Sequence, residues 1–146
     1  MLMLDKTDIR PSGMSQIEPC DLLGRDGTLC HVKRHTTATG ISHLANQGVA
    51  SATVLLRRAE SRDKLAGLIE DRAWDPSSKR HVQEDLGRMA TTQTRLPVSF
   101  AIIGEWTNPA IRNLSLLSRI ALRTATQKLT DLGFPAQIML IGREPN

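Results

Sequence analysis

The feature that most restricts the fold is a strand-like run near the end of the chain, "VSFAII" at 98–103. It carries no charge and contains several β-branched residues, which is typical of a strand buried inside a sheet. A long amphipathic helix is predicted over 114–132, with Gly133 as its stop signal. A second apolar strand, "AQIMLI" at 136–141, follows the helix. The end of the chain is therefore expected to fold as strand, helix and strand.

The order of elements predicts one α/β domain, with α+β as the alternative, in which helices cover a mixed sheet. Residues 1–16 are expected to form a flexible tail, because Pro, Ser and Gly interrupt any periodicity there, and 17–146 the single domain. The expected elements before the buried strand are a β-hairpin at 17–34 and helices at 41–56, 61–73 and 81–90.

Local signals refine these helices. Thr39 is the predicted N-cap of the helix at 41–56, and Ser61 is the predicted cap of the next helix. Gly48 weakens the helix interior and allows a break near Val49. The expected buried face of the last helix comprises Leu117, Ala121, Ala125, Leu129 and Leu132.

Composition and net charge favour some classes of binding partner and exclude others. The chain has 146 residues, a formal net charge of +4 and a pI of about 9.6, which favours an anionic partner such as nucleic acid. Aromatic residues make up only 3%, which argues against binding single strands by base stacking. No signal-peptide pattern precedes Cys20 and Cys30. We therefore expect a cytoplasmic protein in which both thiols are reduced. No stretch approaches the ~20 apolar residues of a membrane span, and no membrane partner is expected.

The hairpin stretch "CDLLGRDGTLCHVKRH" is compatible with two registers. A two-residue loop places Asp21 opposite Cys30, pointing away from Lys33. A three-residue loop places Asp21 opposite His31, so that Asp21, His31 and Lys33 share one face. The position of Gly27 favours the three-residue loop, because Gly adopts the left-handed conformation that such loops need.

An acid, an imidazole and an amine on one face suit phosphodiester chemistry. Asp21 and His31 are candidate ligands for Mg²⁺ or Mn²⁺. Lys33 is a candidate to orient water or to stabilise the charge that develops on phosphate. The competing interpretation is structural: Lys33 is a solvated residue at a strand end, and His31 is half-buried.

The polar stretch after the hairpin precedes a helix N-terminus, where free N–H groups and the helix dipole attract phosphate. His43 and Gln47 lie four positions apart on one helical stripe. Two arginines form a basic stripe on the last helix, which is alternatively a solvated face. The predicted nucleic-acid contacts are Arg34, His35, Thr39, Ser42, His43, Arg119 and Arg123.

These motifs resemble those of a bacterial family described as sporadically distributed proteins of unknown function. The matching motifs are E-x-C-D-L at 18–22, H-V-K-R at 31–34 and T-x-x-S-H-L-x-x-Q-G-x-x-S-A at 39–52. The resemblance runs from about Glu18 to Ile141. Family members are longer, so it implies that this chain corresponds to their C-terminal part, with the rest of such a protein as a partner.

The hairpin and the helix after it also resemble PD-(D/E)xK nucleases of the restriction-endonuclease type. The resemblance implies a restriction-endonuclease-like core that uses Mg²⁺ or Mn²⁺, with Asp21 as metal ligand, Lys33 as catalytic lysine and Gln47 as a supporting helix residue. The sequence departs from the pattern at two positions: His31 stands in place of the middle acid, and Cys20 in place of proline.

Two functional hypotheses follow. The first is a metal-dependent nuclease domain acting on DNA, in bacterial defence or a mobile element. The alternative is a non-catalytic module that binds nucleic acid or associates with itself, with a homodimer formed through the hairpin or the last strand.

Overall fold

The computed structural model describes residues 1–4, 7, 9, 12–13 and 16–142, and within them the chain forms a mixed α/β domain. The five-stranded sheet has the order β1-β2-β3-β4-β5; β1, β2 and β3 are antiparallel, whereas β3, β4 and β5 run parallel. The strands are β1 (Leu2–Met3), β2 (Leu22–Leu23), β3 (Leu29–Arg34), β4 (Val98–Gly104) and β5 (Ala136–Gly142). The helices are α1 (Ala38–Arg57), α2 (Ala59–Glu70), α3 (Pro76–Arg88), α4 (Leu116–Asp131) and the 3₁₀ helix η1 (Ile111–Asn113).

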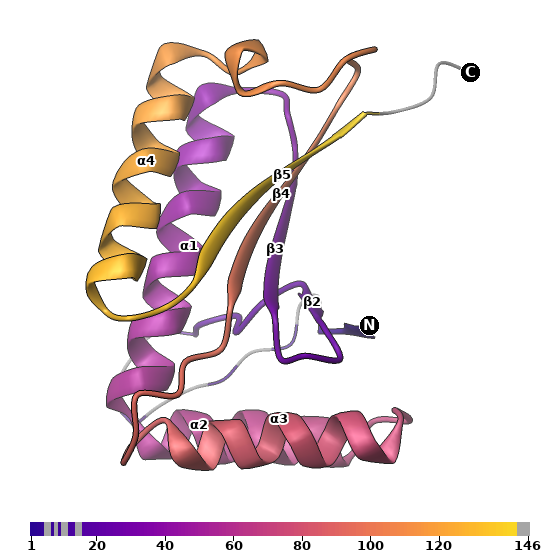
Figure 1. Cartoon of the computed structure of the whole chain (residues 1–146), viewed down its shortest axis with the longest axis vertical. Helices are drawn as coiled ribbons and strands as arrows, with labels where there is room; N and C mark the ends of the chain where they lie inside the picture. The colour runs from indigo at the N-terminus through magenta and orange to yellow at the C-terminus, as the bar shows by residue number, and fades with distance from the viewer. Residues whose placement is uncertain (5–6, 8, 10–11, 14–15, 143–146) are drawn as a thin grey trace.

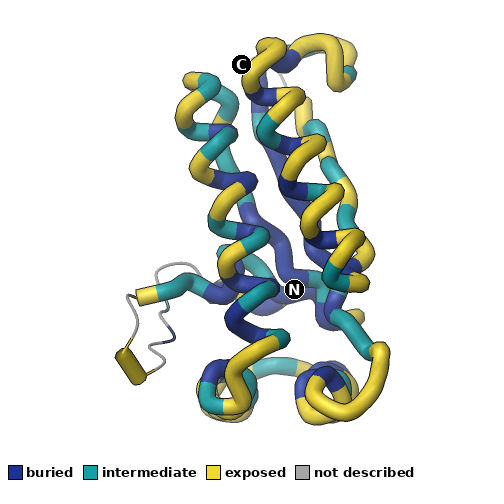
Figure 2. Tube along the Cα trace, turned by 90° about the vertical axis from the view of Figure 1, so that its left-hand side faces the viewer, coloured by how far each residue is buried: buried dark blue, intermediate teal, exposed yellow. Residues whose placement is uncertain are grey.

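Helices α1 and α4 lie side by side on one face of the parallel strands, whereas α2 and α3 lie across the lower end of the sheet (Figure 1). The core lies between these layers, where Phe100 of β4 meets the inner face of α1. Figure 2 shows the same layering as buried inner turns and exposed outer turns on the two long helices. The carboxyl ends of the parallel strands lie at the opposite end from α2 and α3 (Figure 1).

The hairpin has the three-residue loop that the sequence favours. Leu22 is paired with Cys30, which is the register of that loop. Gly27 has a φ of +83°, and its N–H donates to the carbonyl of Gly24 at 3.0 Å. The Asp26 carboxylate accepts hydrogen bonds from the backbone N–H and the hydroxyl of Thr28. Local turn chemistry therefore sets the register of the strand pair.

Several residues of the predicted tail are built into the fold. Leu2 of β1 is paired with Leu23, and Leu4 is buried. Ile9 is also buried and forms an isolated bridge with Ile17. The tail prediction is therefore wrong for these residues, because their apolar side chains bury against the hairpin. The prediction of flexibility for residues 5–6, 8, 10–11 and 14–15 falls outside the described residues.

Helix α1 differs from its prediction at the start and in the middle. Thr37, not Thr39, is the N-cap, and its hydroxyl accepts a hydrogen bond from the N–H of Gly40 at 3.1 Å. The helix continues through Gly48 and Val49 without a break. Gly48 has a packing role instead, because a Cβ there would overlap the ring of Phe100.

Two further helix predictions are corrected. Ser61 does not cap α2, which begins at Ala59; its side chain is buried. Leu117 of α4 is 66% exposed rather than buried. The inward face of α4 is rotated from the predicted one, because the helix must contact both the sheet and α1. Its buried residues are Ser118, Leu122, Ala125 and Leu129.

A pair of glycine substitutions tests the close packing of α1. Gly48→Ala should lower the free energy of unfolding by about 1–3 kcal/mol, because the added methyl meets the Phe100 ring in a packed core. Gly67→Ala in α2 is the matched control, since nothing lies within 4 Å of its Cβ position. That change should be neutral or stabilising by up to about 1 kcal/mol. Urea denaturation measures both, and a Gly48→Ala protein as stable as wild type would contradict this packing.

Candidate functional site

Asp21, the first predicted metal ligand, is hydrogen bonded to a part of β3 that has no strand partner on one side. Strand β2 has only two residues, so it leaves the next part of β3 without a strand partner on that side. The Asp21 carboxylate fills this place, accepting a hydrogen bond from the N–H of Val32 at 2.6 Å. A carboxylate that accepts from backbone N–H stabilises a strand edge where no carbonyl is available.

His31, the second predicted ligand, belongs to the core. It is 2% exposed, and its Nε2 lies 3.2 Å from the hydroxyl of Ser51 on α1. The Ser51 hydroxyl donates to the carbonyl of Gly48 at 3.2 Å, so His31 Nε2 is the donor toward Ser51 in the matching tautomer. Burial lowers the pKa of His31 to about 4. The imidazole is therefore neutral and covered by α1.

Lys33 lies on the same face of β3 as His31, two residues nearer the carboxyl end. It is half-buried, and its Cε lies 3.6 Å from the Cβ position of Gly40 at the start of α1. The predicted register is confirmed, yet the three side chains have separate surroundings. No hydrogen bond or ion pair joins Asp21 to Lys33 in the described part of the chain.

These surroundings do not fit a divalent metal. Mg²⁺ and Mn²⁺ favour oxygen ligands with access to water, whereas His31 is enclosed and Asp21 is hydrogen bonded to backbone. Among the residues that the structure describes, no group of three or more His, Cys, Asp and Glu side chains is placed to hold an ion.

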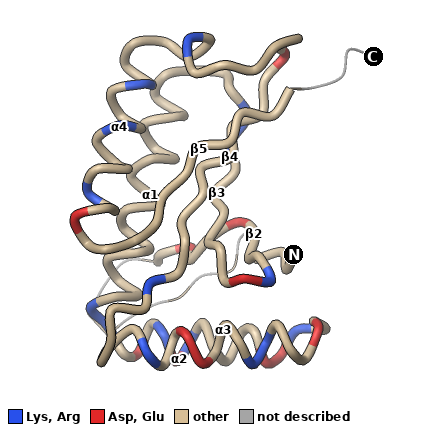
Figure 3. The backbone as a smooth tube through the Cα atoms, in the orientation of Figure 1, with Lys and Arg blue, Asp and Glu red and all other residues tan. Residues whose placement is uncertain are grey.

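The predicted helix residues are distributed over both long helices. Thr39 and His43 are exposed on α1, whereas Gln47 is half-buried. The Ser42 hydroxyl donates to the carbonyl of Ala38 within the helix at 3.1 Å. Figure 3 shows that basic residues predominate along α4, while acidic and basic residues alternate on α2 and α3. The arginines on the exposed surface of α4 are Arg119 and Arg123.

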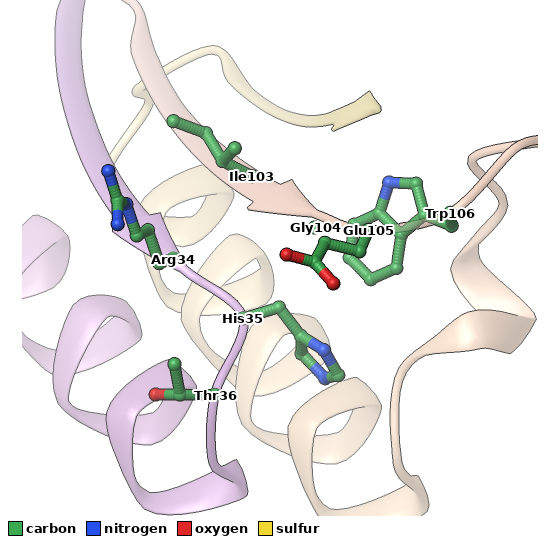
Figure 4. Close-up of a pocket in the computed structure, with 7 residues that line it drawn as sticks. All are labelled: Arg34, His35, Thr36, Ile103, Gly104, Glu105 and Trp106. Atoms are coloured by element: carbon green, nitrogen blue, oxygen red, sulfur yellow. The ribbon is translucent and has the colours of Figure 1, made fainter. Parts of the chain in front are cut away.

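A pocket of about 340 Å³ lies at the carboxyl ends of β3 and β4 (Figure 4). We call it the strand-end pocket. The backbone N–H of His35 donates to the carbonyl of Ile103 at 2.8 Å, which fixes the two strand ends together. The rings of His35 and Trp106 lie 5.1 Å apart at 43°. The lining residues are Arg34, His35, Thr36, Ile103, Gly104, Glu105 and Trp106.

Trp106 forms a fixed wall of the strand-end pocket. A Cβ at Gly104 would lie 2.6 Å from the indole ring, so the absence of a side chain there lets the ring pack on the backbone. The indole Nε1 is buried and has no hydrogen-bond partner in the described part of the chain.

Sequence reasoning found Arg34 and His35 but missed Glu105 and Trp106. Glu105 and Trp106 directly follow β4, whereas Arg34 is the last residue of β3, in register with Ile103, and His35 follows it. Side chains that follow neighbouring parallel strands meet at one edge of the sheet, which is where ligands bind in such sheets. The sequence signal for Glu105 and Trp106 was therefore their position directly after "VSFAIIG". It could be used only once the two strands were known to be parallel.

Comparison with known proteins identifies a family whose function is unknown. Residues 1–142 match a family of unknown function, DUF6119. The chain belongs to this family. No curated protein and no solved structure matches it. In the described part of the DUF6119 chain, none of the helices is long and apolar enough to cross a membrane.

The strand-end pocket of this DUF6119 chain combines opposite charges. The first turn of α1 carries no acidic residue, so the positive end of its dipole is not neutralised locally. Arg34 is exposed at the end of β3. Glu105 supplies the one carboxylate of the lining, and Figure 4 shows it pointing toward the end of β3. The lining of the pocket therefore carries both a cation and a carboxylate.

The buried imidazole predicts a pH-dependent stability. His31 has an ordinary pKa of 6.5 when unfolded and about 4 when folded, so acid favours the unfolded chain. Stability is complete above pH 6.5 and falls as the pH drops toward 4, by about 3 kcal/mol in total. Denaturation between pH 7 and 4 should show this loss. The loss of stability should be smaller in His31→Gln and unchanged in His43→Gln, which alters an exposed histidine and is the control. Equal slopes of stability against pH in wild type and His31→Gln would refute the assignment of this loss to His31.

Proposed function

We propose that this DUF6119 chain binds DNA through a surface at the carboxyl ends of its parallel strands and does not cleave it. The observation that carries the proposal is the strand-end pocket. Its lining includes Arg34 and His35, which come shortly before Thr37, the N-cap of α1, a helix of 20 residues. Phosphate groups bind at such positions through free backbone N–H groups and flanking cations.

The charge distribution supports the proposal. Lys33 and Arg34 end β3 on opposite faces of the strand, and Lys33 is the one on the face that α1 covers. Helix α4 begins at the same end of the molecule and carries Arg119 and Arg123 on its exposed surface (Figures 1 and 3). A net charge of +4 strengthens the long-range attraction to a polyanion.

The nuclease hypothesis stays a prediction with weaker support. It has the confirmed hairpin register, which places Asp21 next to the strand that bears His31 and Lys33. Against it stand the enclosed imidazole and the carboxylate bonded to backbone. DNA binding needs neither group, whereas a metal-dependent nuclease needs both to be free.

DNA binding should depend on the strand-end cations. Arg34→Ala should weaken binding to a duplex about 5- to 10-fold and reduce the slope of log affinity against log salt by about one, because one phosphate contact is lost. Arg57→Ala is the control: it removes the same charge from the exposed last turn of α1, far from the pocket. Fluorescence anisotropy over a salt series measures both. Equal losses in the two variants would show that net charge, not this surface, drives binding.

Cleavage should be absent. Plasmid incubated with the purified chain and Mg²⁺ or Mn²⁺ should stay supercoiled, because the side chains of Asp21 and His31 are held by Val32 and Ser51. Gel electrophoresis over a time course gives the readout. Nicking by wild type that disappears in Lys33→Ala would establish the nuclease and overturn the non-catalytic proposal.

A further inference from the structure

We propose that a second copy of this chain pairs with β5 along the open edge of the sheet, in an antiparallel two-fold arrangement centred on Met139. The inference goes beyond the proposed DNA binding and does not rest on it. Three features of β5 carry it: its length as an edge strand, the apolar side chains that it exposes, and a sequence that is compatible with its own copy.

Strand β5 is a long edge strand. The sheet begins with β1, which has two residues, and ends with β5, which has seven. In the described part of the chain, β5 is paired with β4 on one side and with no strand on the other. Figure 1 shows β5 in front of β4 and β3, with no helix in front of it. The hairpin strand β2, in contrast, is paired on both sides. The last strand is therefore the one that offers a row of backbone groups to a partner.

The backbone of β5 presents every second residue to this open edge. At the start of the strand, the N–H of Val98 donates to the carbonyl of Pro135 at 2.8 Å. In a parallel pair, residues whose N–H and C=O groups bond to the neighbouring strand alternate with residues whose groups point away. Met139 therefore bonds to β4 through its backbone, whereas Ile138 and Leu140 direct their N–H and C=O groups to the open edge.

The side chains of β5 leave this edge without the usual protection. Ile138 and Leu140 pack against the core, whereas Met139 and Ile141, which alternate with them, are 36% and 43% exposed. None of the seven residues is charged, and none is proline. Charged side chains and prolines are the usual means by which proteins prevent an edge strand from pairing. The exposed edge of β5 is therefore suited to receive another strand.

The sequence of β5 is compatible with its own copy. In an antiparallel pair that overlaps all seven residues, Met139 lies opposite the partner's Met139, and Ile138 lies opposite the partner's Leu140. Ile138 and Leu140 then exchange backbone hydrogen bonds, because both point to the shared edge. At the two-fold axis, the Cα atoms of the two methionines are about 4.5 Å apart and their side chains contact. A charged partner strand would find no opposite charge on β5, whereas a second copy matches it at every position.

Sedimentation equilibrium of the full chain tests the inference, at a salt concentration that screens the net charge of +4 on each copy. Wild type should be a monomer in equilibrium with a dimer. Met139→Lys and Met139→Glu should each raise the dimer dissociation constant about 100-fold or more, because two like charges meet at the axis. An equimolar mixture of the two variants should form a dimer again. Leu117→Lys is the matched control, since it places the same charge at an exposed apolar residue of α4.

Amide hydrogen exchange, followed by NMR on wild type, gives a second readout that needs no variant. The N–H groups of Ile138 and Leu140 should exchange more slowly as the protein concentration rises, because the partner strand covers them. The N–H of Met139 should exchange slowly at every concentration, because it is bonded to β4.

The outcomes identify the surface as well as the dimer. A wild-type chain that stays monomeric throughout the concentration series overturns the inference, and so does a dimer that Met139→Lys leaves intact. A dimer that Leu117→Lys disrupts would be assigned to α4 instead. A mixture that does not restore the dimer overturns the two-fold register. If the Met139 variants fail to fold by circular dichroism, equal exchange of Ile138 and Leu140 at all concentrations overturns the pairing. The dependence of DNA binding on Arg34 is measured separately, so the DNA proposal does not stand or fall with the dimer.

Discussion

The close approach of α1 to β3 and β4 is the contact on which the rest of the structure depends. Gly48 supplies the space for the Phe100 ring, and Ser51, one turn further along α1, meets His31. Gly48 and Ser51 thus form a stripe of small residues on the helix. The rings of Phe100 and His31, which come from neighbouring strands, pack against this stripe. A core at this packing density leaves little freedom in the height of the helix above the sheet. The start of α1 is consequently fixed close to the end of β3.

This packing also explains why the chemistry lies at the strand ends and not along the hairpin. A polar residue in the middle of β3 is covered by α1, so His31 loses its charge and becomes part of the core. Lys33, two residues further, reaches the first turn of the helix. Arg34 and His35 lie beyond the covered zone and line the pocket. The same spacing that suggests a metal site in an isolated hairpin therefore gives different environments in the folded domain.

The features that the sequence predicts well are local. The turn at Asp26 and Gly27 sets the hairpin register through contacts within a few residues, and the strand at 98–103 is evident from its own apolar run. Features that depend on distant partners were missed. Leu2 and Ile9 are buried by segments that only the fold brings to them. Leu117 is exposed because the orientation of α4 is set jointly by α1 and the sheet, which its own periodicity does not contain.

The strand-end pocket also depends on segments that are distant in the sequence, and it becomes predictable once the parallel register of the strands is known. Its two halves, around Arg34 and around Trp106, are separated by three helices in the sequence and are joined only by the parallel register of β3 and β4. Helices α2 and α3 lie at the other end of the sheet (Figure 1), so the long connection between the strands leaves the pocket uncovered. A site with an acid among cations selects its ligand by donors and shape, and not by charge alone. Glu105 therefore gives the lining of this pocket a mixed charge, which the basic residues alone would not give it.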